Sequence, residues 1–580
     1  QGQCKVNLEI MKDGEITDAE TVTLRIRRPE QSYKQTFRSR IDGSVQYYAV
    51  NPAASVAADA RPALFLTLHG ATVQASGQVD SYSPKDWGHV VAPTNRRPFG
   101  FDWEDWGRID AIEVLEIVQK RLRTDPQRTY LTGHSMGGHG VWHVGAIYPD
   151  RFAAIGPSAG WISFWTYAGG VASYKNPTPI EQILMRSVAA SQTLALSANY
   201  GQYGVYILHG EKDNEVPVEQ SRRMNRHLRK FHKDVVYHEQ PDVKHWWDLS
   251  KDRPGTDCVD WPAMFDFFAR HKNTPAGQVE KVDFVTVNPG ISAWSDWVGI
   301  IAQIHHLQPS SVSIRYDAAG RRFVGETKNV VCLALDLRHL EPGKPIHVEL
   351  DGQKGENIPW PGAEKRIWLA REGGNWKTVL KPAAAIKGPH RYGPFKQAFD
   401  NRVMFVYGTT GTPAENAWAY AKARYDAETF WYRGNGSIDV IPDTAFDASA
   451  DRDRSVIIYG NADTNAAWAA LLGDSPVQVG RGVIRVGRAK IAESEALACL
   501  FIRPRPESDT ALVAAVSGMG LAGMKLTNRL PYFVSGVGYP DCIVIAPEMF
   551  QRATGGIIMA GFFGLNWSVE TGEFAWAKTE

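Results

Sequence analysis

The chain has 580 residues, which is too long for one hydrophobic core, so we expect roughly two to four domains. Its 64 Lys and Arg residues balance 63 Asp and Glu residues to a net charge of +1, which excludes a global field that attracts nucleic acid or an anionic membrane. No apolar run approaches the ~20 residues that span a bilayer, so no membrane partner is expected. The chain begins at Gln1 without a signal-peptide pattern, so a removed signal peptide would not be visible.

The first 272 residues alternate between strand and helix patterns. Residues 1–34 are predicted as an N-terminal β extension, and residues 35–272 as a doubly wound α/β domain. This domain opens with an antiparallel hairpin around the turn Asp42-Gly43. The later predicted elements are a buried strand at 63–68, a helix at 109–122, strands ending at 134 and 210, and a last helix near 261–271.

After residue 272 the pattern changes twice. Residues 273–395 hold short β-rich runs between Gly, Pro and Asp turns, which predicts a small β-sandwich-like module. Residues 396–580 return to alternating strands and helices, which predicts a second, Rossmann-like α/β domain with a parallel sheet.

The most informative motif is Gly133-His134-Ser135-Met136-Gly137. It has the form G-x-S-x-G, in which a strand turns sharply into a helix and presents a serine in a strained conformation. With 53 glycines in the chain such a pattern could arise by chance. The apolar run before it and the helix pattern after it supply the required strand-turn-helix setting, so Ser135 is the predicted nucleophile.

A serine hydroxyl needs a base, and the base needs an orienting carboxylate. Asp213 follows the strand that ends at Gly210, and His245 lies on a later loop before a helix. These residues give the chain order Ser, Asp, His, so we predict Asp213 as the acid and His245 as the base. The local alternatives are Glu211 and Glu215 for the acid, and His232 and His238 for the base.

Two backbone N–H groups are needed to bind the oxyanion of a tetrahedral intermediate. We predict the N–H of Met136, directly after the nucleophile, and the N–H of Ala71, on the loop after the early buried strand. Because side chains do not take part, we expect Met136→Ala to be mild for turnover and Ser135→Ala to abolish it.

Aromatic side chains crowd the loops expected around the site, which indicates a cleft for an aryl group or a sugar. For each ring taken singly, core packing is the better interpretation. The residues predicted to touch substrate are His134, Trp103, Trp161, Trp165 and Trp246.

Three other patterns are weaker. A G-x-G-x-x-G run at residues 518–523 follows a strand, but only about 57 residues remain after it, so we interpret its glycines as packing devices rather than a dinucleotide site. Residues 408–413 open a helix that could hold an anion but lack a P-loop lysine. The five scattered cysteines form no metal motif, and we expect no metal and no cofactor.

The assembled motifs resemble the esterase branch of the α/β-hydrolase superfamily, near feruloyl esterases, acetyl-xylan esterases and polyhydroxybutyrate-depolymerase-like enzymes, and also the catalytic domain of prolyl-oligopeptidase-family peptidases. The resemblance covers about residues 35–272. It rests on residues 36–50, Leu68-His69-Gly70, residues 133–138, residues 148–152, His209-Gly210, Asp213, Val216-Pro217 and His245-Trp246. It implies a secreted or periplasmic serine hydrolase that works through an acyl-enzyme without a metal.

Prolyl oligopeptidases usually carry a long β-propeller before the catalytic domain, whereas here the elbow already lies at residue 135, which favours an esterase. The predicted function is a serine carboxylic-ester hydrolase that removes acetyl or feruloyl groups from polysaccharide. The alternatives are a prolyl-oligopeptidase-type serine peptidase and a carbohydrate-binding protein with an inactive hydrolase domain. The intact order of Ser135, Asp213 and His245 argues against the last of these.

Overall fold

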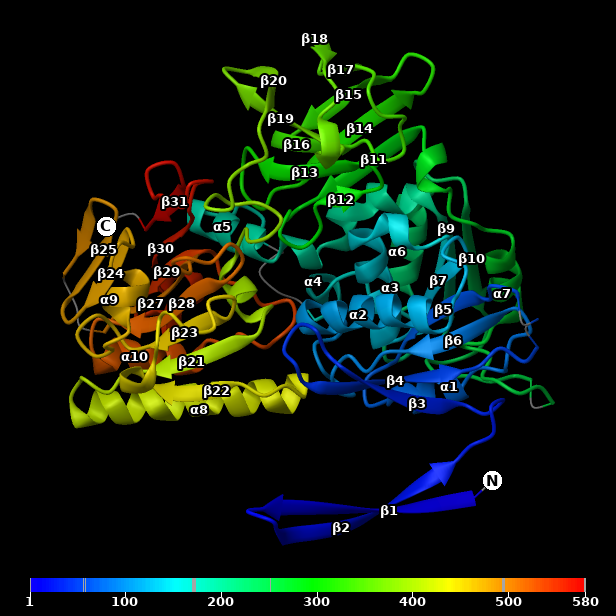
Figure 1. The fold of residues 1–580 in the computed structure, drawn as a ribbon, viewed down its shortest axis with the longest axis horizontal. Coiled ribbons are helices and arrows are strands. Elements are labelled where there is room, and N and C mark those ends of the chain that lie inside the picture. Colours follow the sequence, from blue (N-terminus) through cyan, green and yellow to red (C-terminus); the bar gives the residue numbers. More distant parts are fainter. Residues whose placement is uncertain are drawn as a thin grey trace.

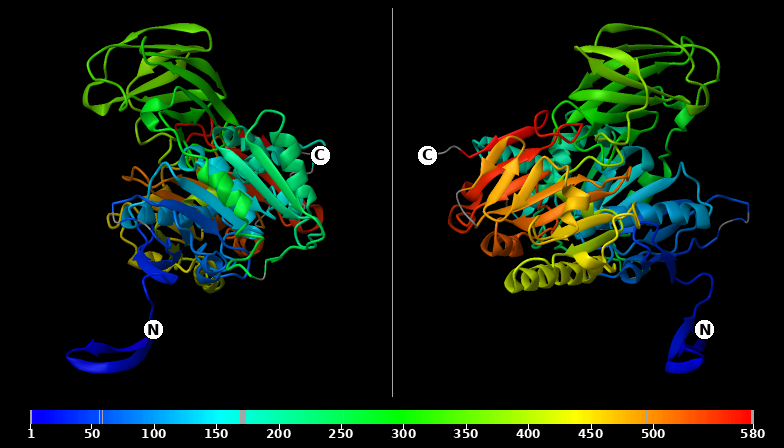
Figure 2. Two further views of the ribbon diagram at one scale, coloured as in Figure 1. Left: turned by 90° about the vertical axis from the view of Figure 1, so that its right-hand side faces the viewer. Right: turned by 60° about the vertical axis from the view of Figure 1, so that its left-hand side comes forward.

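The computed structural model describes residues 2–55, 57, 59–168, 174–250, 252–492 and 496–577. Figure 1 shows a large α/β body with the N-terminal part of the chain, a second α/β body with the C-terminal part, and a β-rich module above them. A two-stranded hairpin of β1 (Gly2–Lys12) and β2 (Glu15–Ile26) stands away from all three bodies in every view (Figure 2).

The first α/β body contains an eight-stranded sheet with the spatial order β10-β9-β8-β7-β5-β6-β4-β3. The predicted hairpin is present as β3 and β4, and β4 also pairs antiparallel with β6, whereas the other neighbours are parallel. The strands are β3 (Tyr33–Arg38), β4 (Val45–Asn51), β5 (Ala63–Leu68), β6 (Gly88–Ala92), β7 (Thr129–His134), β8 (Ala154–Ser158), β9 (Gly204–Gly210) and β10 (Val235–Gln240).

Helices cover both faces of this sheet, as a doubly wound fold requires. One apolar core packs α2, α3 and α6 against the strands, and a second core packs α1 and α7 against the other face. Strands β5, β7, β8 and β9 are buried along their whole length, which explains their continuous apolar sequences. The helices are α1 (Ala75–Asp80), α2 (Asp105–Arg121), α3 (Met136–Ile147), α4 (Phe164–Tyr167), α5 (Pro179–Ser187), α6 (Glu219–Leu228) and α7 (Pro262–Ala269).

The β-rich module consists of two five-stranded sheets that share one apolar core around Trp297 and Phe323. The first sheet contains β11 (Lys281–Thr286), β14 (Ser310–Asp317), β15 (Arg322–Lys328), β17 (Ile346–Leu350) and β18 (Gln353–Ile358). The second contains β12 (Trp294–Ser295), β13 (Val298–Gln303), β16 (Val330–Asp336), β19 (Arg366–Glu372) and β20 (Asn375–Val379). Two sheets that face each other across a core form a sandwich.

The C-terminal body is built on an eight-stranded sheet with the order β22-β21-β23-β28-β27-β29-β30-β31. Only β22, β21, β23 and β28 pair in parallel, so the prediction of a parallel sheet is wrong for the remaining strands, which pair antiparallel. The strands are β21 (Val403–Tyr407), β22 (Asp439–Pro442), β23 (Ser455–Tyr459), β27 (Ala498–Pro504), β28 (Leu512–Gly518), β29 (Cys542–Ile545), β30 (Ile557–Phe562) and β31 (Glu573–Trp576).

Helix α8 (Pro413–Gly434) lies along this body and reaches the first α/β body at its carboxyl end (Figure 1). The shorter elements are α9 (Trp468–Leu472), α10 (Leu521–Leu526), α11 (Met549–Arg552) and a small sheet of β24 (Val477–Gly480), β25 (Val483–Val486) and β26 (Ala489–Ile491). The amino end of α8 is closed by its own capping box, in which Thr412 and Glu415 bond each other's backbone N–H.

The glycines at residues 518–523 permit close packing between β28, α10 and the start of β27. A Cβ on Gly523 would lie 2.1 Å from the carbonyl oxygen of Leu497, and a Cβ on Gly518 would lie 2.4 Å from the backbone nitrogen of Met524. The packing interpretation of this run therefore holds. Of the five cysteines, Cys4 is exposed and the other four are buried, and all five are free thiols.

The two α/β bodies meet through buried aromatic contacts. Phe101 and Trp106 pack on Phe430 of α8, with ring centroids 6.3 and 5.3 Å apart. The indole N–H of Trp106 also donates to the carbonyl oxygen of Phe399 at 2.7 Å. These residues belong to the large core of the C-terminal body, so the two bodies share apolar packing rather than a wet surface contact.

Asp400 lies at this junction, and burial together with the nearby Asp105 carboxylate raises its pKa to about 7. An unfolded chain ionises Asp near pH 4, so the folded chain binds more protons between about pH 4 and 7, and stability falls as the pH rises through that window. We expect Asp400→Asn to raise the free energy of unfolding by about 2 kcal/mol at pH 8 and to change it little at pH 4. Urea unfolding at both pH values measures this, with the exposed Asp453→Asn as control, and equal gains at both pH values would contradict it.

Candidate active site

Ser135 lies between β7 and α3 with φ 61° and ψ −120°, a conformation that costs a non-glycine residue free energy. The neighbouring backbone is packed too tightly for side chains. A Cβ on Gly133 would lie 2.6 Å from the carbonyl oxygen of Leu68, and a Cβ on Gly137 would lie 1.9 Å from the same atom. The glycines of the motif are therefore required by the close approach of β7 and α3 to β5.

Gly137→Ala provides a test of this packing. Alanine is the better helix former, but here its methyl group would meet backbone that cannot move aside, so we expect a loss of about 3 kcal/mol in the free energy of unfolding. Urea unfolding measures it. Gly201→Ala is the matched control because no atom lies within 4 Å of its added Cβ. Equal stability of the two variants would show that the elbow has room to relax.

The predicted acid and base are in contact. Nδ1 of His245 lies 2.7 Å from Oδ2 of Asp213, and the Asp213 side chain is fully buried while that of His245 is 17% exposed. The backbone N–H groups of Glu215 and Val216 donate to Oδ1 of Asp213 at 2.9 Å. One carboxylate oxygen therefore holds the imidazole and the other is fixed by the turn after β9.

The sequence did not predict a role for His209. Its Nε2 lies 3.1 Å from Oδ2 of Asp213, so two imidazoles share one carboxylate oxygen. Hydrogen bonds from His209 and His245 and from the turn outweigh the effect of burial, and they hold the pKa of Asp213 well below its usual range. Asp213 is therefore ionised at neutral pH.

The local alternatives to Asp213 and His245 make contacts outside the proposed site. His232 contacts the carbonyl oxygen of Tyr203 through Nε2 at 2.9 Å, and His238 stacks on Trp261. Oε2 of Glu211 accepts from the backbone of Asp242, and Glu215 contributes its backbone to Asp213 rather than its side chain.

The ring of His134, the residue before Ser135, lies 4.7 Å from the ring of His245 between centroids. The Ser135 hydroxyl makes no hydrogen bond with any residue in the described part of the chain. Nucleophile–base hydrogen bonds are commonly long without substrate and tighten when it binds. Ser135, Asp213 and His245 follow the parallel strands β7, β9 and β10, so they lie toward one edge of the sheet, and a Ser135–His245 hydrogen bond stays a prediction.

Both predicted oxyanion donors are backbone N–H groups without a backbone acceptor in the described part of the chain. The N–H of Met136 is the first of α3, where no helical carbonyl can accept it. The N–H of Ala71 has no backbone acceptor within the described ranges, and a Cβ on its neighbour Gly70 would lie 3.6 Å from the Cβ of Ser135. The side chain of Met136 is buried in the core, so Met136→Ala would cost stability even if turnover changes little.

The predicted substrate-binding side chains fall into two groups. Trp103 is fully buried, and its indole N–H donates to the carbonyl oxygen of His69 at 3.0 Å, so it supports the loop after β5 and cannot face a ligand. His134 and Trp161 are also buried. Trp246, 52% exposed, lies edge-on to His134, and Trp165 lines a cavity described below.

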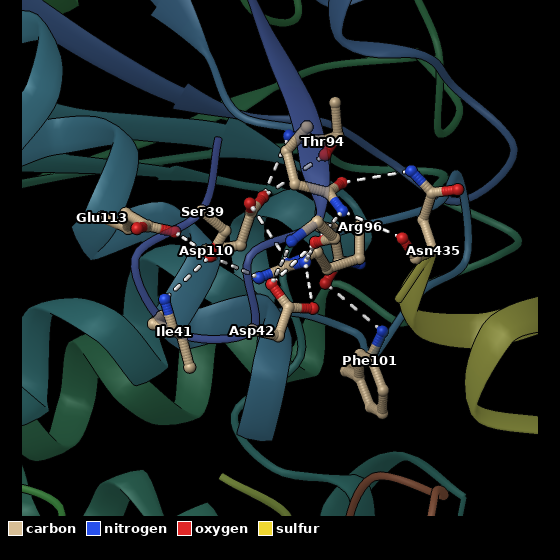
Figure 3. Close-up of polar contacts among 12 residues, drawn as sticks. Ser39, Ile41, Asp42, Thr94, Arg96, Phe101, Asp110, Glu113 and Asn435 are labelled. Carbon is tan, nitrogen blue, oxygen red and sulfur yellow. Dashed lines mark hydrogen bonds and ion pairs between the residues drawn. The ribbon is translucent and has the colours of Figure 1, made fainter. Parts of the chain in front are cut away.

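A buried arginine, which the sequence did not reveal, anchors the loop beside the oxyanion donors. Arg96 bonds Asp42 at 3.2 Å and Ser44 at 2.9 Å, and faces Asp110 at 3.6 Å (Figure 3). Its guanidinium also lies 4.7 Å from the Trp106 ring. Within residues 95–105 six residues have positive φ: Asn95, Arg96, Gly100, Asp102, Trp103 and Asp105. Such strain persists only where surrounding contacts impose it. The Asn95 side chain bonds the backbone of Phe99, Phe101 and Trp103 inside the loop, and Arg96 ties the start of the loop to Asp42 and Ser44.

Part of the chain is similar to a known protein family. Residues 96–273 match the model of the prolyl oligopeptidase family, which is less than half of the chain. An uncharacterized secreted protein from Arthroderma benhamiae is 23% identical over 595 residues, covering 96% of this chain and 61% of its own length. The chain thus spans under two thirds of the curated relative that it matches.

Among the described helices, none combines the length and the apolar sequence that a membrane span requires.

Solved structures similar to this chain include esterases and peptidases. A thermostable esterase is 20% identical, with a TM-score of 0.31, covering 45% of this chain and 69% of its own. A putative dipeptidyl aminopeptidase IV from Bacteroides ovatus is 15% identical, with a TM-score of 0.34, covering 46% of this chain and 40% of its own. At such low scores neither carries a conclusion about activity. The sheet topology and the strand-turn-helix geometry of Ser135 are those of an α/β-hydrolase-type fold, and the family match lies within this body.

Proposed function

We propose that the protein is a secreted carboxylic-ester hydrolase that removes acetyl or feruloyl groups from polysaccharide through an acyl-enzyme. The observation that supports it most is the strained elbow serine beside a bonded Asp213–His245 pair. In this mechanism Ser135 attacks the ester carbonyl, His245 accepts its proton, and Asp213 orients and stabilises the imidazolium. The N–H groups of Met136 and Ala71 bind the oxyanion.

The proton then passes from His245 to the leaving alcohol, and water attacks the acyl-enzyme by the same route. His134 favours this cycle because burial and the nearby His245 keep its pKa well below the usual range, so it stays neutral beside the imidazolium. No group of three or more His, Cys, Asp or Glu side chains in the described ranges is arranged to hold a metal ion.

A second candidate is a serine peptidase, favoured by the match of residues 96–273 to the prolyl oligopeptidase family. The two functions separate in one assay, because esterases and prolyl peptidases differ in the bond they cleave. Purified protein is offered methyl acetate, methyl ferulate and a Gly-Pro-anilide. We expect hydrolysis of the esters, and cleavage of the anilide without the esters would make the peptidase the better assignment.

Secretion is supported by the description of the Arthroderma relative as a secreted protein.

A further inference from the structure

A cavity of about 1070 Å³ lies between the first α/β body and the C-terminal body. One wall is formed by the loop at residues 97–102 and by α4, and the other by the carboxyl end of α8 and residues 534–537. The two bodies are held in register by the buried contacts of Phe101 and Trp106 with Phe430. The cavity is therefore a fixed feature of the way the two bodies pack.

The cavity adjoins the proposed oxyanion site. Thr72, which directly follows Ala71, is part of its lining, and the Thr72 N–H donates to the carbonyl oxygen of Pro98 at 3.2 Å. Gly70, on the same loop, lies against Ser135. The loop that carries the proposed oxyanion donor Ala71 thus continues at Thr72 into the cavity wall, which places the cavity next to the proposed site.

Aromatic side chains from both bodies line the cavity. Three of them present much of their surface to solvent: Phe99 is 59% exposed, Trp431 is 56% exposed and Tyr432 is 74% exposed. Phe164 and Trp165 of α4 complete the set. Large exposed rings on two facing walls are unusual for a protein surface without a ligand.

Two cations accompany the rings. The guanidinium of Arg97 lies 5.1 Å from the centroid of the Trp431 ring, and Arg433 also lines the cavity. Guanidinium groups stack on the negatively charged faces of aromatic rings. A lining of rings and guanidinium planes complements an electron-rich planar ligand. Rings can also stack on a sugar, but the cavity offers few partners for sugar hydroxyl groups beyond Asp102, because the Ser535 hydroxyl already donates to the carbonyl oxygen of Phe101.

We propose that this cavity binds the aromatic acyl group of the substrate, so that the C-terminal body supplies half of the specificity site. The proposal rests on the ester-hydrolase function above and selects the feruloyl-type acyl group over the acetyl group. Ligand cavities of about 300–1000 Å³ hold drug-sized molecules, and an acetyl group would leave this one nearly empty. Trp431 and Tyr432 form the wall that faces Phe99 and Trp165.

Alanine variants of the α8 wall test this assignment. Tyr432→Ala and Trp431→Ala remove exposed rings, so they should leave folding intact. Tyr425→Ala is the matched control, because this tyrosine lies on the same helix and is 61% exposed but does not line the cavity. The readout is the ratio of kcat/KM for methyl cinnamate to kcat/KM for methyl acetate. We expect the ratio to fall about tenfold in Tyr432→Ala and in Trp431→Ala and to stay unchanged in Tyr425→Ala.

A binding measurement keeps the proposal independent of turnover. Free cinnamate is titrated by calorimetry into three proteins: the single variant Ser135→Ala, and the double variants that combine Ser135→Ala with Tyr432→Ala or with Tyr425→Ala. Cinnamate binding that is about tenfold weaker in the Tyr432→Ala double variant, but not in the Tyr425→Ala double variant, supports the aromatic site. If this result is found and no ester is hydrolysed, only the proposed function fails. An unchanged ratio with unchanged binding would overturn the cavity assignment, and so would tighter binding of xylotetraose than of cinnamate.

Discussion

Replacing Ser135 by alanine is expected to lower kcat for ester hydrolysis by about 10⁶-fold, to near the background rate. The hydroxyl is the atom that forms the acyl-enzyme, and no other group at the elbow can take over, because both neighbouring side chains are buried. Stability should change little or rise slightly, since alanine removes a hydroxyl that has no partner within the described ranges. Initial rates with methyl acetate and urea unfolding measure the two effects.

Ser449→Ala is the control for this experiment, because Ser449 is exposed and lies in the C-terminal body. Its hydroxyl bonds only Asp447 of the same turn. Ester hydrolysis that survives in Ser135→Ala but not in a denatured sample would place the nucleophile elsewhere, and the proposed mechanism would be wrong.

Asp213→Asn should lower kcat by about 10⁴-fold while leaving KM nearly unchanged. The amide would offer an N–H where the imidazole N–H of His245 now finds an oxygen, so His245 would adopt the wrong tautomer and could not accept the proton of Ser135. The variant should also lose stability above about pH 4. The depressed pKa of the carboxylate contributes stability that is present above its unfolded pKa and is lost as the pH falls through the folded pKa.

Asp242→Asn is the matched control for Asp213→Asn. Asp242 lies on the loop that leads to His245, its side chain is 79% exposed, and it pairs with Lys212 at the surface. Asparagine is also tolerated at its positive φ of 59°. We expect kcat within about twofold of the parent protein. A similar loss of activity in both variants would mean that loop geometry, and not the Asp213 carboxylate, limits turnover.

Local patterns were sufficient to predict much of the proposed site. The elbow depends on the glycines next to Ser135. The other two residues, Asp213 and His245, follow parallel strands, and the carboxyl ends of parallel strands lie at one edge of the sheet. By contrast, Arg96 acts through partners about fifty residues away, and a single arginine in a loop gives no sign of such contacts. Trp103 shows the same limit, because an aromatic residue on a loop has the same sequence signal whether it is buried or exposed.

The C-terminal sheet illustrates a different limit. Strands β27, β29 and β30 are as apolar as β21 and β23, yet they pair antiparallel. Strand direction depends on the path of the connections, and a buried apolar run is compatible with either direction. The prediction of a fully parallel sheet therefore failed where the connections, and not the strands themselves, determine the topology.

The contact of Phe101 and Trp106 with Phe430 has a consequence for how this protein can be divided. A fragment ending near residue 272 would contain every residue of the proposed acyl-transfer chemistry, but it would leave these two rings in water. Phe101 lies in the strained loop and Trp106 in the first turn of α2, so the loop would lose a supporting partner. The loop in turn holds the backbone next to Ala71, because the carbonyl oxygen of Pro98 accepts from the N–H of Thr72. The first α/β body thus depends on the C-terminal body for part of its apolar packing, and cutting the chain between them is expected to expose that surface.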